Sequence, residues 1–269
     1  MLIDLDGTLL RHEASLPGAA DLLAALEEAS QRRGLRYAVL SNSTLGPRRI
    51  SARLAAAGMA VAPEHIYTAT SAACDRVVHL CTGDAAGAPP RVFNCCTEDV
   101  YELLEGRAEF IETVPEEPHV TAGACDAVIV GTPTNALATP DRQRTALRLV
   151  RAGATLLGTS ADRVFPSDRG IEFGAGALTH MIAYAAGATP QFCGKPQAAF
   201  FLELCRRLDV RPERCLLIGD NLESDIAGGK GVGMHTVLVL SGITTEAHAR
   251  TAPAPLRPDR TIHDLRELL

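Results

Sequence analysis

Tryptophan is absent from the 269 residues, and aromatic residues make up only 4% of the chain. No apolar run reaches the roughly 18 residues that a membrane-spanning helix needs. The N-terminus also lacks the basic segment and long apolar stretch of a secretory signal. We therefore expect a cytoplasmic protein with no membrane span. Its core must be filled mainly by aliphatic side chains, because hydrophobic residues still make up 46% of the sequence.

Positive charge is also in short supply. The 26 Lys and Arg residues are outnumbered by 32 Asp and Glu residues, which gives a formal net charge of −6. Binding to nucleic acids or to anionic membrane surfaces needs clustered Lys and Arg side chains. We therefore expect neither kind of partner, although a small anion can still be bound locally.

The eight cysteines show no C-x-x-C pair and no Cys/His spacing of the kind that binds zinc. Most of them lie in apolar runs, such as Cys215 in the Cys-Leu-Leu-Ile run of residues 215–218. A thiol in such a run behaves as a small hydrophobic side chain. We therefore expect buried free thiols in a reducing compartment.

Short apolar runs alternate with segments of helical period, which predicts an α/β fold with a doubly wound parallel sheet. The predicted strands are 1–3, 37–40, 65–69, 91–93, 127–130, 155–157, 215–218 and 236–240, and the clearest helices are 17–30, 47–57 and 140–152. The middle of the chain has an αβ pattern of its own. We therefore predict a core domain formed by 1–73 and 188–269, and an α/β domain inserted at 74–187.

Three polar clusters begin where a predicted strand ends. They are Asp-Leu-Asp-Gly-Thr at 4–8, Ser-Asn-Ser-Thr at 41–44, and Gly-Asp-Asn-Leu-Glu-Ser-Asp at 219–225. Ligands bind outside these strand ends in an open parallel sheet. Crowded carboxylates need a cation, and their hard oxygen ligands favour Mg²⁺. An isolated Asp-x-Asp is usually a loop feature, but two acidic strand ends together predict a magnesium site.

The cluster at 4–8 resembles the first signature of the haloacid dehalogenase-like phosphohydrolases. Ser41 resembles their second motif, Lys195 in Gly-Lys-Pro at 194–196 their third, and Gly-Asp at 219–220 with Asp225 their fourth. Ser41 follows Asp6 by 35 positions, and Lys195 follows Ser41 by 154 positions. This layout is similar to that of the class II members, which carry an α/β cap domain between the second and third motifs.

Further segments are similar to the p-nitrophenylphosphatase subgroup, which includes phosphoglycolate, pyridoxal phosphate, sugar phosphate and nucleotide phosphatases. They are Pro-Gly-Ala at 17–19, Asp-Arg-Val-Phe-Pro at 162–166, Arg-Gly at 169–170 and Gly-Ala-Gly-Ala at 174–177. The resemblance implies a magnesium-dependent phosphatase acting on a small phosphorylated metabolite. It also implies a possible homodimer formed through the cap.

The resemblance implies a role for each acid. Asp4 would attack phosphorus and form an aspartyl-phosphate. Asp6 would protonate the leaving oxygen and later accept a proton from the attacking water. Mg²⁺ would be held by the Asp4 carboxylate, the Asp6 backbone carbonyl and Asp220. Asp225 would orient this site from beside it.

The same resemblance implies the phosphate-binding residues. Ser41 and Asn42 would donate hydrogen bonds to phosphoryl oxygens, assisted by backbone amides ahead of the helix that begins at Pro47. Lys195 would place a positive charge on the transferring group. A lone Lys before a Pro is usually a surface residue, so its assignment depends on the order of the motifs.

The predicted cap departs from the subgroup at two places. Ser-Ala-Asp at 160–162 stands where the subgroup usually has Asn-Pro-Asp, and Gly-Thr-Pro-Thr-Asn at 131–135 replaces an acid and a Tyr-x-Lys-Leu pattern. Thr132, Asn135 and Asp162 are therefore candidate specificity residues. Loop capping and turn formation explain them equally well.

Two other functions stay open. The aspartyl-phosphate could pass its phosphoryl group to an acceptor other than water, or the chain could be a catalytically silent sensor of phosphorylated metabolites. Dehalogenase chemistry is disfavoured because it needs neither Asp6 nor a metal site. Only three residues precede Asp4, so we expect either a longer natural N-terminus or a short first strand.

Overall fold

The computed structural model describes residues 1–81, 88–112, 121–134, 136–167 and 170–269. These residues pack as two compact units. The first unit comprises Met1–Ser41, Pro47–Tyr67 and Lys195–Leu269, and the second comprises Asn42–Gly46 and Thr68–Gly194. The second unit includes 74–187, the range predicted as an insertion, and also 42–46, 68–73 and 188–194, which were predicted to belong to the core domain.

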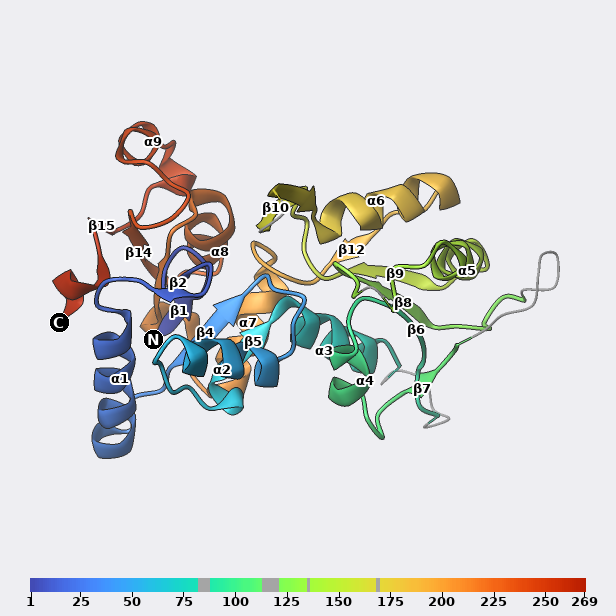
Figure 1. Cartoon of the computed structure of the whole chain (residues 1–269), viewed down its shortest axis with the longest axis horizontal. Helices are drawn as coiled ribbons and strands as arrows, with labels where there is room; N and C mark the ends of the chain where they lie inside the picture. The colour runs from blue at the N-terminus through green and yellow to red at the C-terminus, as the bar shows by residue number, and fades with distance from the viewer. Residues whose placement is uncertain (82–87, 113–120, 135, 168–169) are drawn as a thin grey trace. The chain divides into compact units, whose positions relative to one another are not determined.

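The first unit is built on a six-stranded sheet in the order β15-β14-β13-β1-β4-β5 (Figure 1). The pairings from β15 to β4 are all parallel, which confirms the predicted α/β fold with a parallel sheet. The strands are β1 (Leu2–Asp4), β4 (Ala38–Ser41), β5 (Ile66–Thr68), β13 (Leu216–Gly219), β14 (His235–Val239) and β15 (Arg260–Ile262).

Strand β1 is the central strand although it has only three residues. Leu2 pairs with Ala38 on one side and with Leu217 on the other. Leu2 and Ile3 are fully buried, as expected where helices cover both faces of a parallel sheet. The residue that ends this strand, Asp4, therefore lies in the middle of the carboxyl edge of the sheet.

The helices of the first unit follow its strands. They are α1 (Ala19–Arg33), α2 (Pro47–Ala56), α7 (Ala198–Arg207), α8 (Ala227–Gly231) and α9 (Glu246–Thr251), with short helical turns at Pro63–His65, Pro212–Arg214, Leu222–Ile226, Ala254–Leu256 and Leu265–Leu268. Gly34 ends α1 in the left-handed conformation at φ 65°, a conformation that glycine adopts without steric cost. A small hairpin of β2 (Leu10–Arg11) and β3 (Ala14–Ser15) follows β1.

The second unit contains a five-stranded parallel sheet in the order β12-β9-β8-β6-β7 (Figure 1). Its strands are β6 (Arg91–Cys95), β7 (Glu109–Phe110), β8 (Ala127–Val130), β9 (Thr155–Gly158) and β12 (Gln191–Phe192). Its helices are α3 (Ala69–Cys81), α4 (Asp99–Leu103), α5 (Pro140–Arg151) and α6 (Ala175–Ala186), and β10 (Val164–Ser167) pairs with β11 (Gly170–Phe173) as an antiparallel hairpin.

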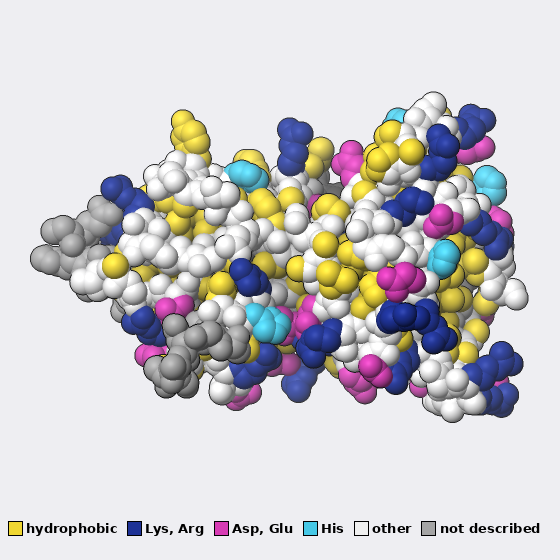
Figure 2. Space-filling view, turned by 180° about the vertical axis from the view of Figure 1, so that it is seen from behind, with side chains coloured by type: hydrophobic (Ala, Val, Ile, Leu, Met, Phe, Trp, Pro, Cys, Tyr) yellow, Lys and Arg dark blue, Asp and Glu magenta, His cyan; other side chains and the backbone are white. Residues whose placement is uncertain are grey.

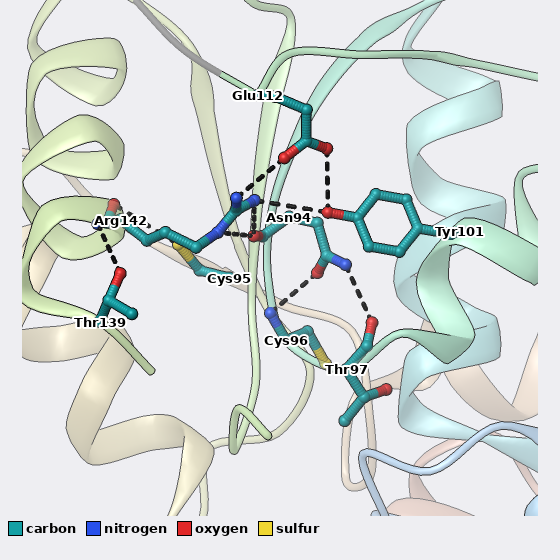
Figure 3. Close-up of polar contacts among 8 residues, drawn as sticks. All are labelled: Asn94, Cys95, Cys96, Thr97, Tyr101, Glu112, Thr139 and Arg142. Atoms are coloured by element: carbon teal, nitrogen blue, oxygen red, sulfur yellow. Dashed lines mark hydrogen bonds and ion pairs between the residues drawn. The ribbon is translucent and has the colours of Figure 1, made fainter. Parts of the chain in front are cut away.

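A half-buried arginine fixes α5 against β6 in this unit (Figure 3). Arg142 donates two hydrogen bonds to the Asn94 carbonyl, at 2.7 and 3.2 Å, and forms an ion pair with Glu112 at 2.9 Å. Its guanidinium carbon also lies 4.6 Å from the centre of the Phe93 ring. The planar guanidinium therefore satisfies a carbonyl, a carboxylate and an aromatic face at once.

Acidic and basic side chains are interspersed on the face of the molecule that Figure 2 presents.

Among the helices of the described chain, none combines the length and the apolar character needed to cross a bilayer. The seven cysteines whose side chains are described are buried free thiols, as the apolar runs around them predicted.

Candidate active site

Three buried carboxylates meet at the carboxyl edge of the first unit's sheet. Asp4 ends β1, Asp220 follows β13, and Asp225 lies in the short turn Leu222–Ile226. Each offers an oxygen atom within 4.8 Å of the others, and their residues are 4%, 5% and 0% exposed. Three negative charges buried this closely require positive partners.

Lys195 supplies one of these partners. Its Nζ donates to Asp4 Oδ1 at 2.5 Å and to Asp225 Oδ1 at 2.6 Å. The lysine is itself only 4% exposed. The two carboxylates raise the pKa of Lys195 above its ordinary value and outweigh the opposing effect of burial. The lysine therefore remains charged, and one positive charge faces three potential negative charges.

The acids show that this compensation is incomplete. Burial raises the pKa of Asp4 well above its ordinary value; Lys195 opposes this shift, while Asp225 and Asp220 add to it. Burial, and then the charge of Asp225, raise the pKa of Asp220 to about 6, against the opposing backbone hydrogen bond from Ile243. In this state the site favours additional positive charge, either protons or a cation.

The loop after β14 completes the surroundings of Asp220, and the sequence did not predict its role. The backbone N–H of Ile243 donates to Asp220 Oδ2 at 2.7 Å. A Cβ atom on Gly242 would lie 1.9 Å from the same oxygen, and one on Gly7 would lie 2.3 Å from it. Only glycine leaves room for the carboxylate at these two positions. A Ser-Gly pair directly after the predicted strand 236–240 was the available signal.

The turn that carries Asp225 is closed by its own polar groups. Asn221 Oδ1 accepts hydrogen bonds from the backbone N–H groups of Glu223, at 2.8 Å, and Ser224, at 3.2 Å. Asp225 Oδ2 accepts from the backbone N–H of Asn221 at 3.2 Å. With Oδ1 bound by Lys195, both oxygens of Asp225 are engaged by named donors. This arrangement suits a residue that orients the site, and the role remains a prediction.

The donor set fits a magnesium ion. Hard carboxylate oxygens are the ligands that Mg²⁺ prefers, commonly one or two together with substrate phosphate oxygens. Asp4 and Asp220 supply such oxygens from adjacent strands, and burial, together with neighbouring acids, raises the pKa of both. The Asp6 backbone carbonyl, the other predicted ligand, belongs to the segment directly after β1.

The side chain of Asp6 is not part of the buried cluster. It is 54% exposed and pairs with Arg53 at 3.3 Å. The neighbouring Thr8 instead donates from its hydroxyl to Asp4 Oδ2 at 3.3 Å. Thus the two acids of the Asp-x-Asp motif differ sharply in environment: one is buried and fixed, and the other reaches solvent.

Of the predicted phosphate-binding residues, Ser41 and Lys195 belong to the first unit. Ser41 is buried at the end of β4, and the pairing of Asp4 with Leu40 places it at the same edge of the sheet as Asp4. Asn42 belongs to the second unit, where its side-chain amide donates to Asp162 Oδ2 at 3.2 Å. One predicted phosphate donor and one predicted specificity residue are therefore in contact.

The other cap candidates are less well defined by contacts. The Thr132 carbonyl accepts from the Thr44 hydroxyl at 3.5 Å, and Asn135 lies outside the described residues. The neighbouring Thr134, which the sequence did not single out, donates to Glu98 at 2.6 Å. The proposed specificity roles of Thr132, Asn135 and Asp162 remain predictions.

Two family models match the chain. Residues 1–106 match haloacid dehalogenase-like hydrolases, and residues 192–268 match a HAD-hydrolase-like family. Together they cover the segments that carry Asp4, Ser41, Lys195 and Asp220.

The chain is also similar along its length to individual proteins. It is 28% identical to a dihydroxyacetone phosphatase of Corynebacterium glutamicum, over 99% of this chain and 89% of that protein. A glycerol phosphate phosphatase of Mycobacterium tuberculosis, solved with magnesium, is 27% identical with a TM-score of 0.80, over 99% of this chain and 75% of that one. A 4-nitrophenylphosphatase of Thermotoga maritima is 25% identical with a TM-score of 0.81, over 99% and 94%.

Proposed function

Because the chain belongs to the haloacid dehalogenase-like hydrolases of the p-nitrophenylphosphatase type, we propose that it is a magnesium-dependent phosphatase that works through an aspartyl-phosphate. The observation that carries the proposal is the buried contact of Lys195 with Asp4 and Asp225 beside Asp220. Such strongly perturbed acids at a strand-end site are typical of catalytic centres.

In the first step, a carboxylate oxygen of Asp4 attacks phosphorus in line with the leaving oxygen. The Asp4 O–P bond forms as the ester P–O bond breaks. Asp6 gives its proton to the leaving oxygen, so the alcohol departs neutral and Asp6 becomes a carboxylate. The solvent-exposed side chain of Asp6 suits a group that must reach a substrate and, later, a water molecule.

In the second step, water attacks the phosphorus of the aspartyl-phosphate. Asp6 accepts a proton from this water, and the P–O bond to Asp4 breaks to release inorganic phosphate. Asp4 returns as a carboxylate and Asp6 as an acid, so the cycle closes without any other reactant. Forming and then hydrolysing the aspartyl-phosphate replaces one difficult displacement by two easier ones.

Charge neutralisation is required because an anionic carboxylate must approach an anionic phosphate. Lys195, fixed between Asp4 and Asp225, places a permanent positive charge at the nucleophile. A bound Mg²⁺, held by Asp4, Asp220 and the Asp6 carbonyl, would supply further charge neutralisation and orient the phosphate. Ser41 donates to a phosphoryl oxygen from the end of β4, and Asn42 is the second proposed donor.

Relatives indicate a small phosphomonoester as the substrate class. These relatives include a dihydroxyacetone phosphatase, a 5′-nucleotidase, an acid sugar phosphatase and a glycerol phosphate phosphatase. We propose that this chain also acts on a small phosphorylated metabolite, and that Thr132, Asn135 and Asp162 contribute to the choice of substrate.

Phosphate release from p-nitrophenyl phosphate and from a panel of sugar, glycerol and nucleoside phosphates tests the proposal. Hydrolysis should require Mg²⁺, stop with EDTA and fall to background in Asp4→Asn. Labelled substrate should leave acid-stable label on the wild-type protein during turnover and none on Asp4→Asn. Metal-independent hydrolysis, or turnover that survives Asp4→Asn, would refute the mechanism.

The same experiments separate the two alternatives. A phosphotransferase would form a new phosphorylated product when alcohols or sugars are supplied, in place of free phosphate. A silent sensor would bind a metabolite, as measured by calorimetry, without releasing phosphate from any member of the panel.

A further inference from the structure

Arg53 of helix α2 contacts both Asp6 and the hairpin that follows it. Its Nη2 donates to Asp6 Oδ1 at 3.3 Å and to the His12 backbone carbonyl at 3.2 Å. Its Nε lies 3.4 Å from Glu13 Oε1. The Arg53 side chain is 23% exposed, against 54% for Asp6 and 72% for Glu13. The arginine is therefore the most enclosed member of this exposed group.

Helix α2 gives Arg53 a rigid base. Ile50 and Leu54, on either side of it in the sequence, are fully buried. Asp6 has no comparable support, because it lies between the end of β1 and the turn in which the Gly7 N–H donates to the Leu10 carbonyl at 2.7 Å. The guanidinium of Arg53, on a well-packed helix, thus holds the carboxylate of Asp6, which lies on a loop.

We propose that Arg53 is a positioning residue for the acid–base chemistry of Asp6, an inference that rests on the function proposed above. By binding Oδ1, Arg53 leaves Oδ2 of Asp6 as the atom that delivers the proton to the leaving oxygen. The guanidinium stays charged throughout the cycle, so its contact with Oδ1 persists through both steps. Through its contact with the His12 carbonyl, Arg53 also holds the β2–β3 hairpin beside Asp6.

A purely structural role makes a different prediction. Ion pairs between exposed side chains add little to stability. If Arg53 has only a structural role, its replacement should therefore have a small effect, and this effect should be the same for all substrates. Loss of a positioned general acid affects substrates according to their leaving group. A poor leaving group such as an alkoxide needs the proton, whereas p-nitrophenolate departs readily without it.

The experiment measures kcat/KM for a series of aryl and alkyl phosphates, including p-nitrophenyl phosphate and glycerol phosphate, with wild type, Arg53→Met and Asp6→Asn. The ratio kcat/KM reports transfer to Asp4 and is independent of the later hydrolysis step. Arg206→Met is the matched control, because Arg206 is an exposed arginine of the same unit that pairs with Glu203 at 2.7 Å.

Arg53→Met should lower kcat/KM for glycerol phosphate by about 10- to 100-fold, the range expected when a catalytic group is displaced. The same change should alter kcat/KM for p-nitrophenyl phosphate by less than about threefold. The dependence of kcat/KM on the leaving group should therefore become steeper and approach that of Asp6→Asn. Arg206→Met should leave that dependence unchanged. An equal loss on all substrates, or no loss, overturns the proposal. If wild-type hydrolysis does not depend on Asp4, the proposed function itself fails.

Discussion

The ammonium of Lys195 lies 2.5 Å from Oδ1 of Asp4, although 191 positions separate the two residues. Both are at most 4% exposed, so the contact is made almost entirely out of water. A buried ion pair of this kind is expensive to assemble and costly to break. Replacing a buried ion pair by well-packed apolar residues is often neutral or stabilising, so the proposed function, and not stability, is our explanation for this pair.

Replacing Lys195 by Met should reduce both activity and stability. Loss of the cation that faces the nucleophile should lower kcat by about 10²- to 10³-fold. Removing one partner of a buried pair should lower the free energy of unfolding by about 3–5 kcal/mol. Phosphate release and urea unfolding in EDTA measure the two effects.

Two comparisons make this prediction specific. Lys230→Met removes a half-buried lysine that pairs with Asp259 at 3.2 Å and should change activity little. In an Asp4→Asn background, Lys195→Met should destabilise less than in wild type, because one carboxylate fewer is left uncompensated. Equal destabilisation in both backgrounds would contradict the role assigned to this contact.

The metal-free protein should lose stability as pH rises through the range in which Asp220 ionises. Folding raises the pKa of Asp220 to about 6, chiefly through burial and the charge of Asp225, from about 4 in an unfolded chain. The folded state therefore binds this proton more tightly than the unfolded state. The contribution is fully present below about pH 4 and is lost as pH rises through about 6.

Magnesium should reverse this loss. At a hundredfold excess over its Kd, a ligand that binds only the folded state adds about 2.7 kcal/mol. The increase in Tm on adding Mg²⁺ should accordingly be larger at pH 7.5 than at pH 5, where protons compete for the carboxylates. Thermal unfolding in EDTA and in Mg²⁺ at both pH values measures this, and an equal increase at the two pH values would argue against a carboxylate metal site.

Gly242→Ala should displace Asp220 and weaken magnesium binding. The added Cβ would lie 1.9 Å from Asp220 Oδ2, too close to be accepted without movement of the carboxylate or the loop. The magnesium concentration for half-maximal activity should rise at least tenfold. Gly231→Ala is the control, because Gly231 ends α8 with no heavy atom within 4 Å of the added Cβ. A Gly242→Ala enzyme with unchanged magnesium dependence would contradict the packing argument.

The sequence predicted much of the fold because hydrophobic pattern and turn residues act locally. The strand predicted at 127–130 is β8 (Ala127–Val130). The helix predicted at 140–152 is α5 (Pro140–Arg151), and Thr139 caps it by accepting a hydrogen bond from the Arg142 N–H at 3.3 Å. The hairpin β10–β11 was not predicted as a pair. Its residues Ile171 and Phe173 are 77% and 70% exposed, so they lack the alternation of a half-buried strand.

The candidate site was predicted only in part, for a different physical reason. Strand ends identified Asp4, Ser41 and Asp220, because parallel strands deliver their carboxyl ends to one edge. Contacts formed by distant loops leave no such local pattern. Two such contacts are the hydrogen bond from the Ile243 N–H to Asp220 and the one from the Arg53 guanidinium to Asp6. Both depend on tertiary packing, so only the three-dimensional structure reveals them.

Arg142→Met should loosen the second unit without altering the chemistry of the first. The substitution removes the hydrogen bonds to the Asn94 carbonyl and the ion pair with Glu112. Loss of charge-assisted hydrogen bonds of this kind costs about 1.5–3 kcal/mol. Native-state hydrogen exchange should therefore become faster in α5 and β6, while β1 and β13, which belong to the other unit, keep their protection. Arg144→Met, which removes an exposed pair with Asp141 on the same helix, should leave exchange in β6 unchanged. Faster exchange in β1 to the same extent would show that Arg142 supports the whole chain and not one unit.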